Sequence, residues 1–249
     1  MNTLGIIPAR WGSTRFPGKP LVKIGDKSMI QRVFEQSKKA LDNVFVATDD
    51  QRIADEVNRF GGQVVMTRSD HKSGTDRCAE ALFNIESLLL EKFDVVVNIQ
   101  GDEPFIQVKQ IMDVTSCFND PDVQIATVIK KITTQDALLN PNNPKVVLNL
   151  NNEAIYFSRS IIPFIVNTEV SNWLEKTTFY EHLGLYAYKS EVLRQITKLP
   201  PSVLEISESL EQNRWIENAF RIKVVLTDYE NISIDTQEDL QNILKSGNY

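Results

Sequence analysis

Short apolar runs alternate with amphipathic segments along the first half of the chain. The runs predict buried strands at about 4–7, 43–47, 63–67, 94–99 and 123–132. Between them, apolar residues recur at helical spacing in four segments, at about 28–41, 51–60, 76–90 and 105–118. Because a crossover between parallel strands is right-handed and usually carries a helix, this alternation predicts an α/β fold with a mostly parallel sheet and helices on both faces.

Local residues set the expected ends of these helices. Ser28 is the expected cap of the first helix, and Ser73 or Thr75 the expected cap of the third. Gly61 occupies the position that ends the second helix, because glycine adopts the left-handed conformation found there without strain.

The pattern changes in the second half of the chain. Two strand-like runs joined by a polar turn, 145–149 and 154–158, predict a β-hairpin, and 183–188 predicts a further strand. We expect a smaller β-rich lobe at about 145–190, embedded in a single domain that spans 1–249 and laid over the mouth of the parallel sheet. The remaining pattern predicts helices at 191–199, 203–218 and 237–245 and strands at 221–227 and 232–234.

The loop after the first predicted strand concentrates positive charge in a chain whose net charge is -6. It carries three permanent cations and two glycines: Arg10, Arg15, Lys19, Gly12 and Gly18. Open α/β sheets bind ligands at the carboxyl ends of their strands, so the loop predicts a site for a polyanion, with glycine amides and cationic side chains around phosphate oxygens. It is not a Walker loop, because five residues and not four separate the glycines, and Pro20 stands where a magnesium-binding hydroxyl is required. A solvated basic loop with two incidental glycines is the alternative.

Two aspartates follow predicted strands and are candidates for a metal site. Asp102 lies in NIQGDEP and Asp235 in NISIDTQED, so both would reach the carboxyl edge of the sheet beside the basic loop. Mg²⁺ is usually held by one or two carboxylates together with substrate phosphates. The alternative is a capping role, for Asp102 at the helix near Phe105 and for Asp235 at the last helix. Arg77, in a first helical turn that disfavours cations, indicates either a nearby anion or a chance surface position.

Composition limits the classes of partner. A net charge of -6 argues against a nucleic-acid groove or an anionic membrane surface, both of which need a basic face, so the basic loop is expected to serve a small molecule. Two cysteines among 249 residues give no disulfide framework and fit a reducing compartment. With no basic leader, cleavage signature or long apolar segment, we expect a cytoplasmic protein without membrane insertion.

Several other enzyme chemistries fit the sequence poorly. The two histidines, His71 and His182, are not accompanied by a cysteine cluster, which argues against a zinc site. Neither GxSxG nor GxGxxG occurs, which argues against a serine hydrolase and a dinucleotide site. On pattern alone, His182 in FYEHLGLYAY is more often a hydrogen-bonded strand histidine than a catalyst.

With these segments in view, the chain resembles the CMP-Kdo synthetases, the 3-deoxy-manno-octulosonate (Kdo) cytidylyltransferases. The resemblance runs in order from residue 4 to about 240 and is carried by IIPAR, STRFPGKPL, VATDD, SDHKSGTDR, VNIQGDEP, YFSRSIIPF, HLGLYAY, LEQNR and IDTQEDL. Other sugar nucleotidyltransferases share the opening loop. The combination of the SGTDR, NIQGDEP and HLGLYAY segments is specific to this family.

The resemblance implies a Rossmann-like nucleotidyltransferase fold and the reaction of CTP with Kdo to give CMP-Kdo and pyrophosphate, for lipopolysaccharide biosynthesis. It assigns Arg10 and Lys19 to the triphosphate and Asp102 and Asp235 to Mg²⁺, with Gln100 reading the nucleotide. The implied nucleotide set is Ala9, Arg10, Ser13, Arg15, Lys19, Arg77 and Gln100. In the implied sugar set Arg159 faces the carboxylate and the others bind hydroxyls: Arg159, His182, Tyr186, Glu211 and Gln212. Family members also imply a homodimer that pairs through the β-rich lobe.

The exact sugar acid stays open at this point. Glu181 stands where the family more often has arginine, and the segment LEISES lacks an expected histidine. An amino-substituted Kdo or a related keto acid is therefore an alternative, as is a sialic-acid type of nucleotidyltransferase. The alternative outside the enzymes is a regulator that binds a nucleotide without turnover. Such a regulator would not need Asp102 and Asp235, and the chain has both, which favours the enzyme.

Overall fold

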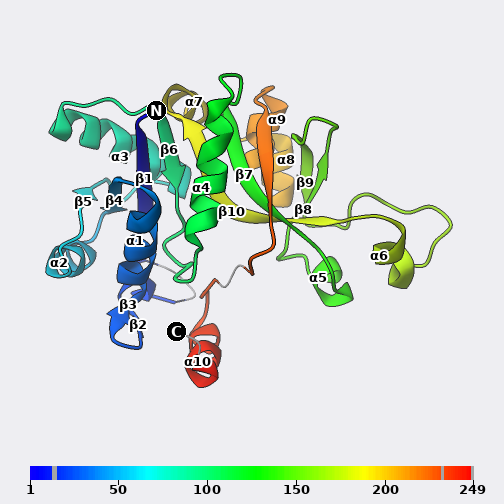
Figure 1. Ribbon diagram of the computed structural model, residues 1–249, viewed down its shortest axis with the longest axis horizontal. Helices are drawn as coiled ribbons and strands as arrows, with labels where there is room; N and C mark the ends of the chain where they lie inside the picture. Colours follow the sequence, from blue (N-terminus) through cyan, green and yellow to red (C-terminus); the bar gives the residue numbers. More distant parts are fainter. Residues whose placement is uncertain (13–15, 231–232, 248–249) are drawn as a thin grey trace.

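One nine-stranded sheet organises the molecule, with the strand order β11-β7-β10-β6-β1-β4-β5 and with β8 and β9 attached beside β10 (Figure 1). The computed structural model describes residues 1–12, 16–230 and 233–247. The strands of the main path are β1 (Thr3–Ala9), β4 (Asn43–Thr48), β5 (Val64–Met66), β6 (Val95–Asn98), β7 (Ile125–Lys131), β10 (Tyr180–Lys189) and β11 (Ile222–Thr227).

The sheet is mostly parallel, as the sequence predicts. β1 pairs in parallel with both β4 and β6, β4 with β5, and β7 with β11. β10 is the exception, because it runs antiparallel between β6 and β7. The carboxyl ends of β1, β4 and β6 therefore meet at one edge of the sheet.

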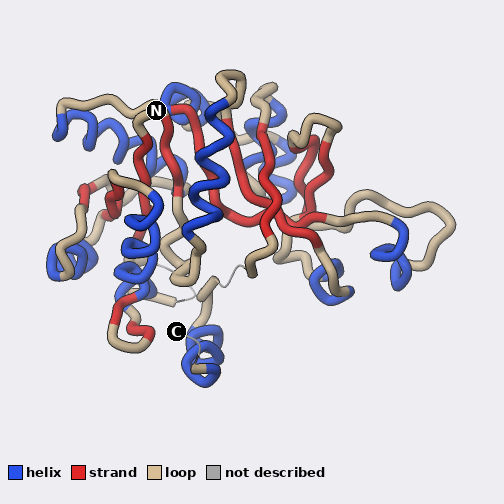
Figure 2. The backbone as a smooth tube through the Cα atoms, in the orientation of Figure 1, coloured by secondary structure: helices blue, strands red, loops and turns tan. Residues whose placement is uncertain are grey.

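Helices cover both faces of the sheet, which confirms the predicted class (Figure 2). On one face, side chains of α3 (Gly74–Leu89), α7 (Ser190–Ile196) and α9 (Gln212–Glu217) share a buried cluster with Leu4 and Ile6 of β1. On the other face, α1 (Met29–Ala40), α2 (Gln51–Arg59) and α4 (Val108–Ser116) share a second cluster with Ile7 and Ala9. Neighbouring positions along β1 thus supply different cores, because side chains alternate along a strand.

The predicted hairpin forms a lobe beside the main sheet. β8 (Lys145–Leu148) and β9 (Ala154–Ser158) pair antiparallel, and β8 pairs with the first residues of β10. β10 also pairs with β7 of the main sheet on both sides of a register shift between Leu183 and Tyr186, so one strand belongs to both parts. The lobe also carries α5 (Gln135–Leu139) and α6 (Trp173–Lys176), and Figure 1 shows α6 and its flanking loop extending away from the sheet. The division into one domain with an embedded lobe at 145–190 stays a prediction.

Several predicted element ends are wrong. The predicted helix at 203–218 is two helices, α8 (Val203–Glu208) and α9, because Ser209 adopts a left-handed conformation that ends the first. Residues 233 and 234 form no strand, and the rest of the strand predicted at 232–234 lies outside the described residues. Ser28 stands at the start of α1 but its side chain makes no capping bond, whereas Ser73 does cap α3.

The pattern also missed a short hairpin, β2 (Lys23–Ile24) with β3 (Lys27–Ser28). The last helix, α10 (Gln237–Ser246), packs on this region, because Leu240 and Ile234 share a small core with Ile24 and Met29. The far end of the chain is thereby held next to the basic loop near its beginning. No described helix has the length and apolar character needed to cross a membrane.

Candidate active site

A cavity of about 260 Å³ opens where β1 and β6 end. Seven predicted residues line it: Ala9, Arg10, Lys19, Arg77, Gln100, Asp102 and Asp235. They come from the first strand and its loop, α3, the segment after β6 and the segment before α10. Ser13 and Arg15, which complete the predicted nucleotide set, lie outside the described residues.

The centre of this cavity is an ion-pair group of one lysine and two aspartates. Lys19 Nζ lies 2.7 Å from Asp102 Oδ2 and 3.1 Å from Asp235 Oδ1. The Lys19 side chain is 13% exposed, whereas the two carboxylates are 29% and 39% exposed. A backbone hydrogen bond from Ile234 N to Asp102 O, 3.0 Å long, joins the two aspartate segments directly. The sequence prediction that these two acids lie beside the basic loop is confirmed.

The sequence left open that Asp102 and Asp235 only cap helices, Asp102 at α4 and Asp235 at α10, and the structure shows which residues cap these helices. Gln107, not Asp102, occupies the N-cap of α4, so the capping explanation for Asp102 is wrong. Thr236 caps α10 through its hydroxyl, which accepts from Asp239 N. Asp239 Oδ2 in turn accepts from the amides of Asp235 and Thr236 at 3.0 and 2.8 Å. The capping box therefore orients the backbone of Asp235 and leaves its carboxylate to Lys19.

Lys19 owes its position to a tight turn. Gly18 has φ 72°, and a Cβ there would lie 2.9 Å from the Trp11 ring, so glycine is required twice over. Its amide donates to Trp11 O at 3.0 Å, which corrects the expectation that this amide faces a phosphate. The Arg52 guanidinium stacks over Trp11, 3.4 Å from the ring centroid, and helps to hold the indole in place.

Gln100 is oriented by the bulged strand beside it. Its Nε2 donates to Gly184 O at 2.9 Å, within the irregular part of β10. At Gly101, the next residue, the backbone passes close to that of β1. A Cβ at this position would lie 3.0 Å from Pro8 O. The chain therefore passes tightly behind β1 before Asp102 turns into the cavity.

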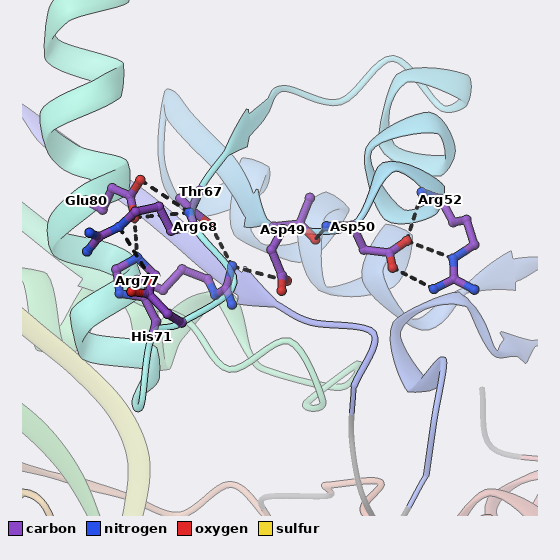
Figure 3. Close-up of polar contacts among 10 residues, drawn as sticks. Asp49, Asp50, Arg52, Thr67, Arg68, His71, Arg77 and Glu80 are labelled. Atoms are coloured by element: carbon purple, nitrogen blue, oxygen red, sulfur yellow. Dashed lines mark hydrogen bonds and ion pairs between the residues drawn. The ribbon is translucent and has the colours of Figure 1, made fainter.

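The anion expected near Arg77 is a residue of the protein itself. Arg77 is only 4% exposed, and its Nη1 donates to Thr67 Oγ1 at 2.6 Å and lies 3.3 Å from Asp49 Oδ1 (Figure 3). Asp49 follows β4 and Thr67 follows β5, so Arg77 ties two strand ends to the start of α3.

Sequence reasoning gave no role to the loop before α3, although His71, Lys72 and Ser73 line the cavity. Glu80 of α3 holds this loop, because it contacts His71 Nε2 and accepts from Arg68 N (Figure 3). The sequence feature that could have predicted this role is the segment HKS, which follows a predicted strand and ends in the capping Ser73, with a lysine next to that serine.

Comparison with known proteins identifies the relatives of this chain. A family model described as cytidylyltransferase matches residues 4–226. The 3-deoxy-manno-octulosonate cytidylyltransferase of Parabacteroides distasonis is 57% identical over 98% of this chain and 97% of its own. That of Bacteroides thetaiotaomicron is 58% identical over 97% of this chain and 96% of its own.

The chain belongs to the 3-deoxy-manno-octulosonate cytidylyltransferase family.

Solved structures support the same placement. A CMP:2-keto-3-deoxy-manno-octonic acid synthetase complexed with CTP superposes with a TM-score of 0.90 at 37% identity, covering 99% of this chain and 98% of that chain. A 4-diphosphocytidyl-2C-methyl-D-erythritol synthase from Anaerococcus prevotii shares the fold alone, at 14% identity and a TM-score of 0.65.

In this cytidylyltransferase, two predicted sugar residues lie in an aromatic cluster. The His182 ring centroid lies 5.0 Å from that of Phe157 and 5.1 Å from that of Tyr186. His182 Nε2 lies 3.0 Å from Thr127 Oγ1, whose own hydrogen goes to Leu185 O at 2.8 Å, so the histidine is the donor. Burial lowers the pKa of His182 to about 3, which keeps the ring neutral near pH 7. The structural role expected from the pattern is therefore confirmed, and contact with a sugar stays a prediction.

The other sugar candidates lie around the turn between α8 and α9. Glu211 accepts from Thr75 Oγ1 at 2.6 Å, and burial raises its pKa. It lines a hollow that also includes Lys72 and Ser73, which are part of the wall of the first cavity. Gln212 follows as a buried residue at the start of α9.

Arg159 supports this turn. Its Nε donates to Glu208 O at 2.7 Å, Nη2 to Ser209 O at 3.3 Å and Nη1 to Pro141 O at 3.0 Å. The strand-end arginine thus binds three backbone carbonyls, as a structural arginine does. The expected contact between Arg159 and a sugar carboxylate stays a prediction.

The Asp239→Ala variant tests the capping box of α10. We expect about 1 kcal/mol less local helix stability, because the amides of Asp235 and Thr236 lose the carboxylate that accepts from them, while the Thr236 hydroxyl keeps its bond from the backbone amide of residue 239. Hydrogen exchange across 237–246, followed by mass spectrometry, should quicken. Glu238→Ala, which removes an exposed acid from the same turn, is the matched control. Similar exchange in both variants would show that Asp239 does not hold the helix start.

His182 predicts a pH dependence of stability. Its pKa is lower in the folded protein than its usual 6.5, so the unfolded chain binds more protons below pH 6.5 and stability falls as the pH decreases toward 3. Between pH 7 and pH 5, wild type should lose about 2 kcal/mol more unfolding free energy than His182→Gln. Urea unfolding at both pH values measures this difference. Parallel losses in the two proteins would contradict a buried neutral histidine.

Proposed function

We propose that this cytidylyltransferase joins CTP to Kdo, giving CMP-Kdo and pyrophosphate for lipopolysaccharide biosynthesis. The relatives with more than half of their residues identical to this chain carry that activity in their names, and the most similar solved structure described above holds CTP. The observation that carries the proposal is the cavity at the carboxyl edge, where cations of the first loop meet two aspartates from distant segments.

The cations suit a triphosphate. Lys19 and the exposed Arg10 lie in the same cavity, and Lys72 reaches it from the loop before α3. A guanidinium offers paired donors to phosphate oxygens and an ammonium offers a concentrated charge. During attack on the α-phosphorus, negative charge grows on the leaving pyrophosphate, and cations already in place stabilise that charge without reorganising. No covalent enzyme intermediate is required.

The two aspartates fit a magnesium ion. They already converge on one cation, the Lys19 ammonium, at hydrogen-bond distance from each. No group of three or more His, Cys, Asp or Glu suited to a metal occurs among the described residues, so phosphate oxygens and water would complete the shell. Bound there, Mg²⁺ would act as a Lewis acid on the phosphates and lower the pKa of a coordinated hydroxyl. Asp102 and Asp235 would be its protein ligands.

We propose that different residues select the two substrates, one set the nucleotide and another set the sugar. Gln100 reads the nucleotide with an amide that Gly184 already orients. On the sugar side, the neutral His182 donates at Nε2 and can accept a hydroxyl hydrogen at Nδ1. The Glu211 carboxyl lines the adjoining hollow, and the buried Gln212 amide, next to it in the chain, is a further hydrogen-bonding group.

Two further expectations stay predictions. A homodimer through the lobe accords with apolar side chains exposed there, Phe164 at 73% and Val166 at 69%. A cytoplasmic location accords with the two free cysteines, Cys78 and Cys117.

Pyrophosphate release tests the proposed reaction. The purified protein is given CTP, UTP, ATP or GTP, each with Kdo, 8-amino-Kdo or sialic acid, with and without Mg²⁺. We expect release with CTP, Kdo and Mg²⁺ together, and mass spectrometry should detect CMP-Kdo. Absence of release from every pair would overturn the proposal, and release with only another sugar would correct the substrate.

Asp102→Ala should lower kcat by about 10²-fold or more, because the site loses one of its two metal-binding carboxylates and the transition-state stabilisation that depends on it. The fold should persist, since a partly exposed ion pair adds little stability. The measurements are pyrophosphate release and thermal melting. The control variant is Asp122→Ala. Asp122 is exposed and lies just before the start of β7, at the end of that strand away from the cavity, so this variant should retain the wild-type rate. Wild-type turnover by Asp102→Ala would remove this residue from the metal site.

A further inference from the structure

Lys19 occupies the place between Asp102 and Asp235 that a metal ion would need. Its ammonium contacts one oxygen of each carboxylate, at 2.7 and 3.1 Å. The lysine is also the least exposed of the three side chains. The two carboxylates therefore have a counter-cation that the chain itself supplies.

An ammonium in this position opposes metal binding in two ways. It uses carboxylate oxygens that would coordinate the ion, and it repels a divalent cation brought to the same point. Mg²⁺ also gives up its hydration water reluctantly, so two partly neutralised carboxylates are a weak replacement. The described residues supply no third acid that would form a metal-binding group with them.

A nucleoside triphosphate removes this obstacle. Its phosphate oxygens offer Lys19 a new anionic partner and offer the metal additional ligands in the same cavity. Once the ammonium shifts toward the phosphates, both carboxylates are available for the ion. Metal and nucleotide then bind cooperatively, because each improves the site for the other.

We propose that Lys19 is the counter-cation of Asp102 and Asp235 in the nucleotide-free protein and keeps their Mg²⁺ affinity low until a nucleoside triphosphate draws it away. The inference rests on the proposed function, because the same cavity binds CTP there. It gives Lys19 opposite effects in two measurements. Replacing it weakens turnover but strengthens metal binding to the free protein.

The experiment measures metal binding without turnover. Mn²⁺ binding to nucleotide-free protein is followed by electron paramagnetic resonance of the free ion, and Mg²⁺ binding by calorimetry. Lys19→Met keeps an unbranched side chain as far as the ε position and removes the charged amino group, and we expect its Kd for Mn²⁺ to be at least tenfold lower than that of wild type. Adding Asp102→Asn to Lys19→Met should abolish the gain. With cytidine 5′-(α,β-methylene)triphosphate present, wild type should bind Mn²⁺ tightly.

A matched variant controls for net charge. Lys23→Met removes an equal charge four residues away, from a side chain that is 48% exposed and pairs with Glu56, and should leave Mn²⁺ affinity as in wild type. Equal Mn²⁺ affinity in wild type and Lys19→Met, or an equal gain in Lys23→Met, would overturn the inference. If Lys19→Met does not fold, Lys19→Gln provides the same test.

The metal measurement is independent of the reaction. A wild-type protein that releases no pyrophosphate would contradict the proposed function, whatever its affinity for Mn²⁺. A wild-type protein that turns over but binds Mn²⁺ tightly without nucleotide would contradict only the role of Lys19.

Discussion

Charge neutralisation between Lys19, Asp102 and Asp235 is the interaction on which the cavity depends. The three residues come from the first loop, the segment after β6 and the segment before α10. Two carboxylates this close repel each other unless a cation lies between them. In the structure Lys19 is this cation, and we propose that magnesium takes its place during the reaction. The same two acids can therefore hold the site together and bind the cofactor, at different stages of binding.

Backbone geometry places these groups with little freedom. Gly18 is held in a left-handed turn under Trp11, Gly101 passes close to Pro8 O, and the Thr236–Asp239 capping box fixes the chain at Asp235. Loops that bind ligands are often mobile, but these three described segments are held by a turn, a close contact and a cap, respectively. Such preorganisation favours a reaction whose catalysis depends on positioning and charge.

The antiparallel β10 connects the nucleotide side to the sugar side. In its irregular middle, the carbonyl of Gly184 accepts a hydrogen bond from Gln100. On either side of this irregularity, His182 and Tyr186 belong to the aromatic cluster. The first residues of β10 pair with β8, so a displacement of the lobe would act on the same strand that orients Gln100. Arg159 extends this connection by fixing the turn that carries Glu211.

The sequence by itself determined the fold class, the place of the basic loop and of the two aspartates at the carboxyl edge, and the family. The first two depend on local patterns, namely alternating apolar runs and charged residues after buried strands, whereas the family depends on the resemblance of whole segments such as NIQGDEP and HLGLYAY. Only the tertiary structure decided that Lys19 lies between the two aspartates, that Asp49 is the anion beside Arg77 and that Arg159 is bound to three carbonyls. It also decided where the predicted helix at 203–218 breaks and that the first residues of β10 pair with β8. These features depend on contacts between segments far apart in the chain, and side-chain periodicity carries no information about which distant groups meet.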